Sequence, residues 1–309
     1  MRITHNMIGA HLINAIQLNL EGLVRGQERM STGKKVNRPS DDPSGTSQIM
    51  SVMTDLDCTR QYLRNVDDGL SWLNQADAAM GNATSLLQQA RRIAVQGSNG
   101  TLTGDDMALL AQQVDDLIWG LVDVGNTSVG GKFIFARNQL NDPPFKRNGD
   151  AIEFEGSTSP PPLPGPPWGT VERAVYYGST AMVNVDGVYL FLTSPGGGMP
   201  NIFNALFDLR DALRIGDLNG VDAAIGKLDG SLDWLMESRV TIGARTNRLE
   251  NLQSQMRDNE VRMTGVLSNL QDSDIARATI EFQQKQLSYQ AALSAGARML
   301  QTSLLDYLR

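Results

Sequence analysis

The distribution of proline is the feature that most limits how this chain can fold. All twelve prolines lie at positions 39–43 or between 143 and 200. The stretches 44–142 and 201–309 contain none. Because proline removes a hydrogen bond from a helix interior and clashes with the preceding turn, long helices avoid it. Two long proline-free stretches around a proline-rich middle therefore predict two helical arms with a non-helical insert between them.

The first arm carries an unbroken heptad pattern, in which ten of fourteen positions are apolar. The pattern predicts one continuous helix, roughly 70 Å long, that packs along a seam. Asp42 is placed to cap its start with Pro43 at the first helical position, and 97–100 ends it. A second helix is expected at 105–123. The heptad positions are Ile49, Val52, Leu56, Thr59, Leu63, Val66, Leu70, Leu73, Asp77, Met80, Thr84, Leu87, Arg91 and Ala94.

The middle of the chain changes from a period of 3.6 residues to a period of 2. Asp186-Gly187 and Asn148-Gly149 are typical of tight turns, the first as a type I′ hairpin. We expect a small β domain that the stem does not need in order to fold, with an extended proline-rich loop at 159–167. The predicted strands are 133–135, 152–155, 171–177, 183–185 and 188–192.

The second arm returns to a helical pattern. We expect a short helix at 201–215, a long one at 218–270, and a last one that starts near Asp274. The predicted fold class is mainly α with a β insert. A long, coiled-coil-like helical stem is built from the N- and C-terminal arms, and a small β domain is inserted in the middle.

Composition excludes several classes of function. The net charge of −7 and the isoelectric point of about 4.9 disfavour nucleic acid and anionic membranes as partners. No apolar run is long enough to span a membrane, and the amino terminus lacks the apolar stretch of a signal peptide. The single cysteine, Cys58, excludes an intramolecular disulfide. His5 and His11 point to different sides of a helix and cannot share a metal. We predict no catalytic residue, cofactor or metal, and therefore no enzyme.

Both ends of the chain carry apolar stripes at helical spacing. A single helix cannot recover the entropy of its own ordering, so such stripes need a partner surface. The two ends could zip together, pack on neighbouring subunits, or do both, which favours an assembly protein over an enzyme. The predicted subunit-interface residues are Leu12, Ile16, Leu23, Met30, Ile275, Phe282, Tyr289, Leu293, Leu300, Leu304 and Tyr307.

Several segments of the two arms then resemble the flagellin family. The Pro-Ser-Asp-Asp-Pro form at 39–43 is more similar to the hook–filament junction members than to filament flagellin. The segment 131–136 resembles the point where the family's helical domain gives way to its variable insert, although Arg137 stands where members commonly have glycine. The segments that carry the resemblance are 29–43, 97–104, 131–136, 239–250, 272–276, 289–293 and 303–308.

The resemblance implies a self-assembling structural protein of the bacterial flagellum, secreted and extracellular. Its terminal helices would form the inner tube, and its β domain would face outward. It would leave the cell unfolded through the flagellar type III apparatus, without signal cleavage. The implied partners are hook-associated protein 1, flagellin, copies of itself and a flagellar export chaperone. Filament flagellin is the alternative within the family; a type III secretion translocator or a coiled-coil signalling module is the alternative outside it.

The domains expected on this basis are two assembly helices, a stem in two parts and the insert. Their bounds are 1–40 for the N-terminal assembly helix, 41–132 and 201–271 for the stem, 133–200 for the outward-facing β domain, and 272–309 for the C-terminal assembly helix.

Overall fold

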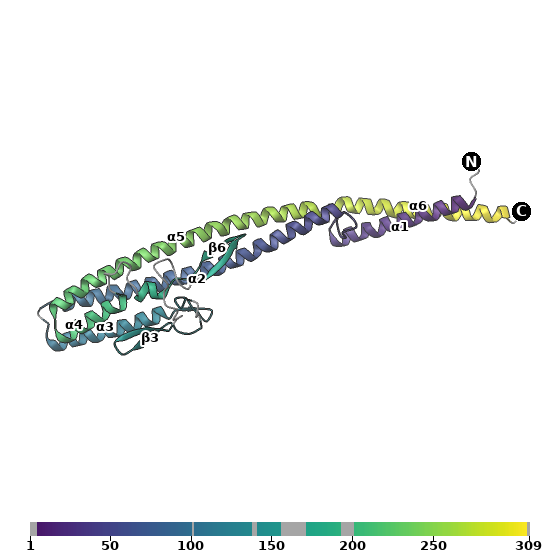
Figure 1. Ribbon diagram of the computed structural model, residues 1–309. Helices are drawn as coiled ribbons and strands as arrows, with labels where there is room; N and C mark the ends of the chain where they lie inside the picture. Colours follow the sequence, from purple (N-terminus) through teal and green to yellow (C-terminus); the bar gives the residue numbers. More distant parts are fainter. Residues whose placement is uncertain (1–4, 101, 138–140, 156–170, 193–200, 308–309) are drawn as a thin grey trace. The chain divides into compact units, whose positions relative to one another are not determined.

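A computed structural model describes residues 5–100, 102–137, 141–155, 171–192 and 201–307; the side chains of 5, 6, 8 and 299–307 lie outside the description. The chain forms two compact units, one from 1–58 with 258–309 and one from 59–257. The helices are α1 (His5–Thr32), α2 (Pro43–Gly97), α3 (Gly104–Gly125), α4 (Ile202–Ile215), α5 (Leu218–Gln271) and α6 (Ile275–Tyr307) (Figure 1). The predicted fold class, mainly helical with a β insert, is confirmed.

The helices start and end where the sequence predicts, and capping side chains explain why. The carboxylate of Asp42 accepts from the backbone N–H of Gly45 at 2.9 Å, directly before α2. Thr103 and Asp106 form a reciprocal capping box at the start of α3. Asn201 caps α4, and Gly216 ends that helix with a φ of 72°. Each cap satisfies backbone groups that a helix end otherwise leaves without partners.

The heptad of α2 forms the seam of the stem, and nine of its ten apolar positions are buried. Its two charged positions pair with α5. Arg239 donates to both carboxylate oxygens of Asp77 at 2.8 and 3.0 Å. Arg91 donates to Asp229 at 2.5 and 3.3 Å. Two polar breaks in an apolar stripe therefore become ion pairs between the stem helices. Figure 1 shows α3 and α4 beside this part of α2 and α5.

Three separate antiparallel strand pairs lie in the described part of the segment from 128 to 192. They are β1 (Ser128–Val129) with β2 (Lys132–Phe133), β3 (Phe145–Asn148) with β4 (Ala151–Phe154), and β5 (Glu172–Tyr176) with β6 (Ser179–Met182). The turn at Asn148-Gly149 and the strands near 152–155 and 171–177 are confirmed. Strand β3 was not predicted, and of the segment 133–135 only Phe133 is in a strand.

The hairpin predicted around Asp186-Gly187 is wrong. Residues 183–185 are not a strand, and Val188–Leu192 is a π-helix, η1. The carboxylate of Asp186 caps this helix by accepting from the backbone N–H of Val188 at 2.9 Å. A Cβ on Gly187 would lie 2.6 Å from the carbonyl oxygen of Phe135, so the glycine permits a close tertiary approach. The proline-rich loop predicted at 159–167 lies outside the described residues.

Arg137 has a φ of 54° and is the one non-glycine residue with positive φ in the part of the chain that the structure describes. A glycine at this position would adopt that conformation without strain. Its side chain offers a compensating contact. The guanidinium donates to both carboxylate oxygens of Asp186 at 2.8 Å, and both side chains are largely buried.

Aromatic side chains of the insert belong to the same hydrophobic core as the stem helices. Phe145 and Phe191 are almost fully buried and contact Phe203 of α4. The side-chain amide of Asn126, at the end of α3, both donates to and accepts from the backbone of Phe145, each at 2.9 Å. This packing argues against the expectation that the stem folds without its insert.

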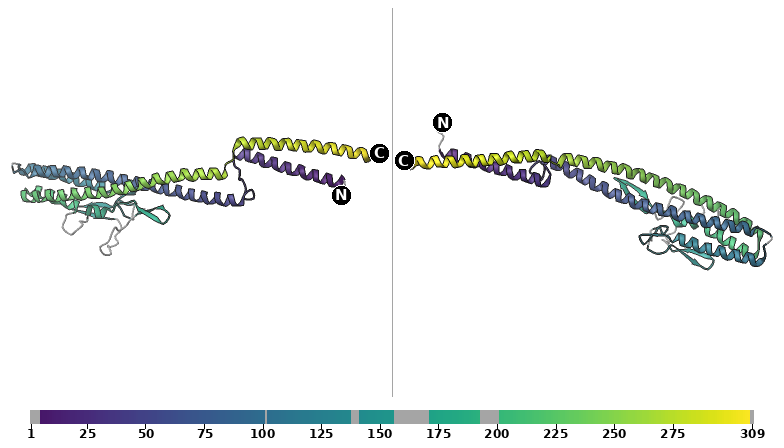
Figure 2. Two further views of the ribbon diagram at one scale, coloured as in Figure 1. Left: turned by 90° about the horizontal axis from the view of Figure 1, so that it is seen from above. Right: turned by 180° about the vertical axis from the view of Figure 1, so that it is seen from behind.

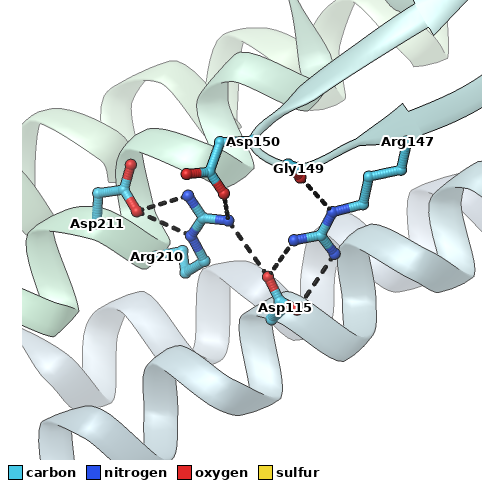
Figure 3. Close-up of polar contacts among 6 residues, drawn as sticks. All are labelled: Asp115, Arg147, Gly149, Asp150, Arg210 and Asp211. Carbon is cyan, nitrogen blue, oxygen red and sulfur yellow. Dashed lines mark hydrogen bonds and ion pairs between the residues drawn. The ribbon is translucent and has the colours of Figure 1, made fainter.

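An ionic network around the buried side chain of Arg210 fastens hairpin β3–β4 to α3 and α4 (Figure 3). Arg147 of β3 donates to Asp115 of α3 at 2.6 and 3.2 Å. Arg210 of α4, fully buried, donates to the same carboxylate at 3.3 Å, to Asp150 at 2.8 Å and to Asp211 at 2.8 Å. The Arg147 guanidinium, opposed by burial and assisted by Arg210, holds the pKa of the Asp115 carboxyl below its usual range.

None of the helices in the described part of the chain is long and apolar enough to cross a membrane.

Candidate assembly interface

Helices α1 and α6 form an antiparallel pair, and both views of Figure 2 show them side by side. Glycines lie where the two helices meet. A Cβ on Gly26 would lie 3.3 Å from the ring of Phe282, and one on Gly22 would lie 3.3 Å from the side chain of Lys285. A Cβ on Gly296 would lie 2.9 Å from Leu12. Because small residues let helix backbones approach closely, glycines of one helix pack against large side chains of the other in this pair.

The predicted interface residues fall into three groups: half-buried, exposed, and those whose side chains lie outside the description. Those that are half-buried within the subunit are Leu12, Ile16, Leu23, Met30, Phe282 and Tyr289. Ile275 and Leu293 are 60% and 44% exposed. Leu300, Leu304 and Tyr307 lie in α6, but their side chains are outside the description. Their role in contacts between subunits stays a prediction.

Additional apolar side chains stand on the outer faces of the pair. Ile13, Leu20 and Val24 of α1 are between 45% and 59% exposed and recur at intervals of seven and four residues. Ile280 and Leu287 of α6 are 57% and 66% exposed, seven residues apart. Such spacing aligns side chains along one face of a helix. The interface residues predicted from the sequence did not include these five, nor the three glycines that form the contact.

The pair has almost no interior of its own. Among the residues whose burial the structure describes, none in α1 is buried, and in α6 only Ala278 and Gly296 are. An ion pair between the helices joins Arg29 and Glu281 at 3.9 Å, and both side chains are substantially exposed. Exposed pairs of this kind contribute less than about 1 kcal/mol. The pair is thus a surface that lacks a covering layer.

The segment between α1 and α2 is ordered by its own aspartates. The carboxylate of Asp41 accepts from the backbone N–H groups of Asn37 at 3.3 Å and of Arg38 at 3.0 Å. Asp42 caps α2, as described above, and Arg38 also pairs with Glu28 of α1 at 3.3 Å. The adjacent carboxylates of Asp41 and Asp42 therefore order the segment that connects α1 to α2. They do not face one another across a site where acid–base chemistry could occur.

The described residues hold no group of three or more metal-ligating side chains. Cys58 is exposed. Within this part of the chain, the geometry defines a helical subunit whose terminal helices present uncovered apolar faces.

Both arms match models of one protein family. The bacterial flagellin N-terminal helical region matches residues 3–139, and the bacterial flagellin C-terminal helical region matches residues 225–308. Together these matches cover more than two thirds of the chain. The chain belongs to the flagellin family, whose members are structural proteins of the bacterial flagellum.

Individual relatives include both junction and filament proteins. The chain is 27% identical to flagellar hook-associated protein 3 of Escherichia coli, over 93% of this chain and 96% of that protein. It is 25% identical to a flagellin of Halalkalibacterium halodurans over the full length of both.

Solved structures share the fold. A flagellar hook-associated protein from Vibrio parahaemolyticus has a TM-score of 0.65 at 19% identity, covering 75% of this chain and all of that one. Flagellar hook-associated protein 3 from Legionella pneumophila has a TM-score of 0.60 at 15% identity, covering 72% of this chain and 98% of that one.

Proposed function

We propose that this protein is the structural adaptor between the hook and the filament of a bacterial flagellum, and that it assembles through its terminal helices. The observation that carries the proposal is the α1/α6 pair. It exposes Ile13, Leu20 and Val24 on one helix and Ile280 and Leu287 on the other, with almost no buried side chain between the helices. Burying a side chain of this size contributes about 1.5–3 kcal/mol, and this free energy would be gained again in each of the identical contacts between neighbouring subunits.

Two observations favour the junction over the filament. The Pro-Ser-Asp-Asp-Pro segment at 39–43 has the form seen in junction members. Hook-associated protein 3 of Escherichia coli is similar over nearly the whole chain. Filament flagellin remains a second candidate because a flagellin is similar over the full length at 25% identity. Copy number separates them, since a filament protein is abundant and a junction protein is scarce.

The partners proposed for a junction protein lie on both sides of it. Hook-associated protein 1 would contact the hook side, flagellin the filament side, and copies of this chain would complete the ring. The carboxy-terminal helix would bind an export chaperone before the unfolded chain leaves through the flagellar type III apparatus. The five predicted domains keep their proposed roles, with α1 and α6 in the inner tube and the insert facing outward.

A deletion strain tests the junction role. Cells that lack this protein should build hooks but release their flagellin into the medium, because flagellin would have no adaptor on which to polymerise. Restoring the gene should restore attached filaments. If the deletion instead removes all flagellin from both cells and medium, the protein is the filament subunit. If filaments remain attached and of normal length, the junction role is wrong.

A further inference from the structure

The connections at the base of the two terminal helices are bonded to each other. The backbone N–H of Lys35 donates to the carbonyl of Gln271 at 2.8 Å, and the backbone N–H of Ser273 donates to the carbonyl of Gly33 at 2.8 Å. Between these bonds, Lys34 and Asp272 form an antiparallel bridge. We call this arrangement the terminal clip; it comprises Gly33, Lys34, Lys35, Gln271, Asp272 and Ser273.

The terminal clip also satisfies helix ends that would otherwise lack partners. The side-chain amine of Lys35 donates to the carbonyl of Asn269 at 2.7 Å, so Lys35 serves two of the last carbonyls of α5. The carboxylate of Asp274 accepts from the backbone N–H of Ala276 at 3.0 Å at the start of α6. Unpaired backbone groups at helix ends are costly, so these bonds define one preferred geometry.

The contact between α1 and α6 fixes the alignment of the two helices less firmly than the terminal clip does. The described contacts are glycines, half-buried apolar side chains and the long ion pair between Arg29 and Glu281. A slide of seven residues would place Tyr289 opposite Gly26, where Phe282 now lies, and would exchange one aromatic side chain for another. The same slide would separate Ser273 from Gly33 by roughly 10 Å more, at about 1.5 Å per residue.

We propose that the terminal clip sets the alignment of α1 against α6. It thereby decides which apolar side chains of the two helices share an outer face, and its residues are positioning residues for assembly. The consequence for assembly rests on the proposed function. The alignment itself is a property of the single subunit and is measured without assembly.

Gly33 allows the terminal clip to be altered through the backbone alone. Its φ is 69°, and nothing lies within 4 Å of the position that a Cβ would occupy. A β-branched residue is strongly disfavoured in this conformation, whereas asparagine adopts it readily. Gly33→Val and Gly33→Asn are therefore a matched pair, because both add a side chain to open space and only the first opposes the backbone.

Cysteine pairs report the alignment. A Cβ at position 26 would lie 3.6 Å from the Cβ of Phe282, within the range of a disulfide. In a Cys58→Ser background, Gly26→Cys with Phe282→Cys reports the native alignment. Gly26→Cys with Tyr289→Cys reports a slide of one heptad. Dilute full-length protein is oxidised mildly, and the yield of each cross-link is measured on denaturing gels.

With the clip intact, the first pair should cross-link and the second should not. Gly33→Val should lower the ratio of native to shifted cross-link by roughly 5- to 30-fold, the cost of forcing this backbone conformation on a non-glycine residue. Gly33→Asn should keep the ratio within about twofold of the parent. Equal ratios in the two variants would overturn the proposal, and so would failure of the first pair to cross-link in the parent.

Assembly is scored separately, by complementing a deletion strain with Gly33→Val and Gly33→Asn. A shifted cross-link ratio with normal filaments supports the clip and contradicts the proposed use of the terminal helices. An unchanged ratio contradicts the clip whatever the filaments do.

Discussion

Phe145 tests whether the insert is part of the stem's core. Its side chain is 1% exposed and contacts the rings of Phe154 and Phe191 at centroid distances of 5.4 and 5.5 Å, and that of Phe203 at 5.9 Å. Phe145→Ala would leave a cavity among these rings. Removing a buried phenylalanine typically costs about 3–5 kcal/mol. Each 1 kcal/mol lowers the melting temperature of a domain of this size by roughly 2–4 °C.

We therefore expect Phe145→Ala to lower the melting temperature of the helical circular dichroism signal by roughly 6–20 °C in a single transition. Tyr177→Ala is the matched control, because Tyr177 is an aromatic residue of the same insert that is 88% exposed. Its effect should stay within about 0.5 kcal/mol. An unchanged main transition in Phe145→Ala would show that the insert folds apart from the stem, and would restore the expectation drawn from the sequence.

Three further predictions concern other parts of the chain. Leu293→Asp should leave the melting temperature of the monomer unchanged, because the side chain is 44% exposed, yet it should abolish filament growth. Ser288→Asp is the control, and secretion is checked for both variants. Arg137→Gly should destabilise the subunit by about 1–3 kcal/mol in a denaturant titration. Relief of backbone strain does not offset the loss of the cation that pairs with buried Asp186. The folded-state pKa of Asp115 is depressed, so its contribution to stability is present above the unfolded pKa of about 3.9 and is lost as pH falls through the folded pKa. Asp115→Asn should therefore flatten this part of the acid unfolding curve.

The helical architecture could be predicted because the signals for it are local. The heptad of α2 and the cap at Asp42 act within a few residues, and the structure confirms both predictions. The caps that the structure shows at Asn201 and Asp274 are equally local. Gly243 lies inside α5 and does not break the helix. Open space around this position means that the glycine costs helix propensity but disturbs no packing.

The insert was harder to predict because tertiary contacts decide its conformation. Strand β3 reads Phe-Lys-Arg-Asn, with a single apolar residue, and is held by Asn126 and Asp115 from α3. Asp186-Gly187 has the sequence of a hairpin turn. Instead, the carboxylate of Asp186 caps η1 and pairs with Arg137, while Gly187 makes room for the backbone of Phe135. No pattern in the neighbouring sequence contains this information.

Apolar periodicity located the terminal stripes but did not show which face of each helix lies at the α1/α6 contact and which is exposed. A stripe drawn from large side chains includes Leu293, which is exposed, and omits Gly22, Gly26 and Gly296, which lie at the contact. The glycines were missed because hydrophobicity gives them little weight. The spacing of Gly22 and Gly26, four residues apart on one helix face, is the signal that could have found them.

The low burial of the α1/α6 pair links the stability of the terminal helices to assembly. Long isolated helices gain little stability in water without a packed face. Among the described residues of these two helices, only Ala278 and Gly296 are buried. The core of the 59–257 unit, in contrast, includes many residues with no exposed surface, among them Leu73, Ile118 and Phe203. Subunit contacts that bind only the ordered pair would stabilise it in proportion to their affinity. On the proposed function, the terminal helices would gain a hydrophobic interior where other chains cover Ile13, Leu20, Ile280 and Leu287, so ordering of these helices and addition to the growing structure would become one step.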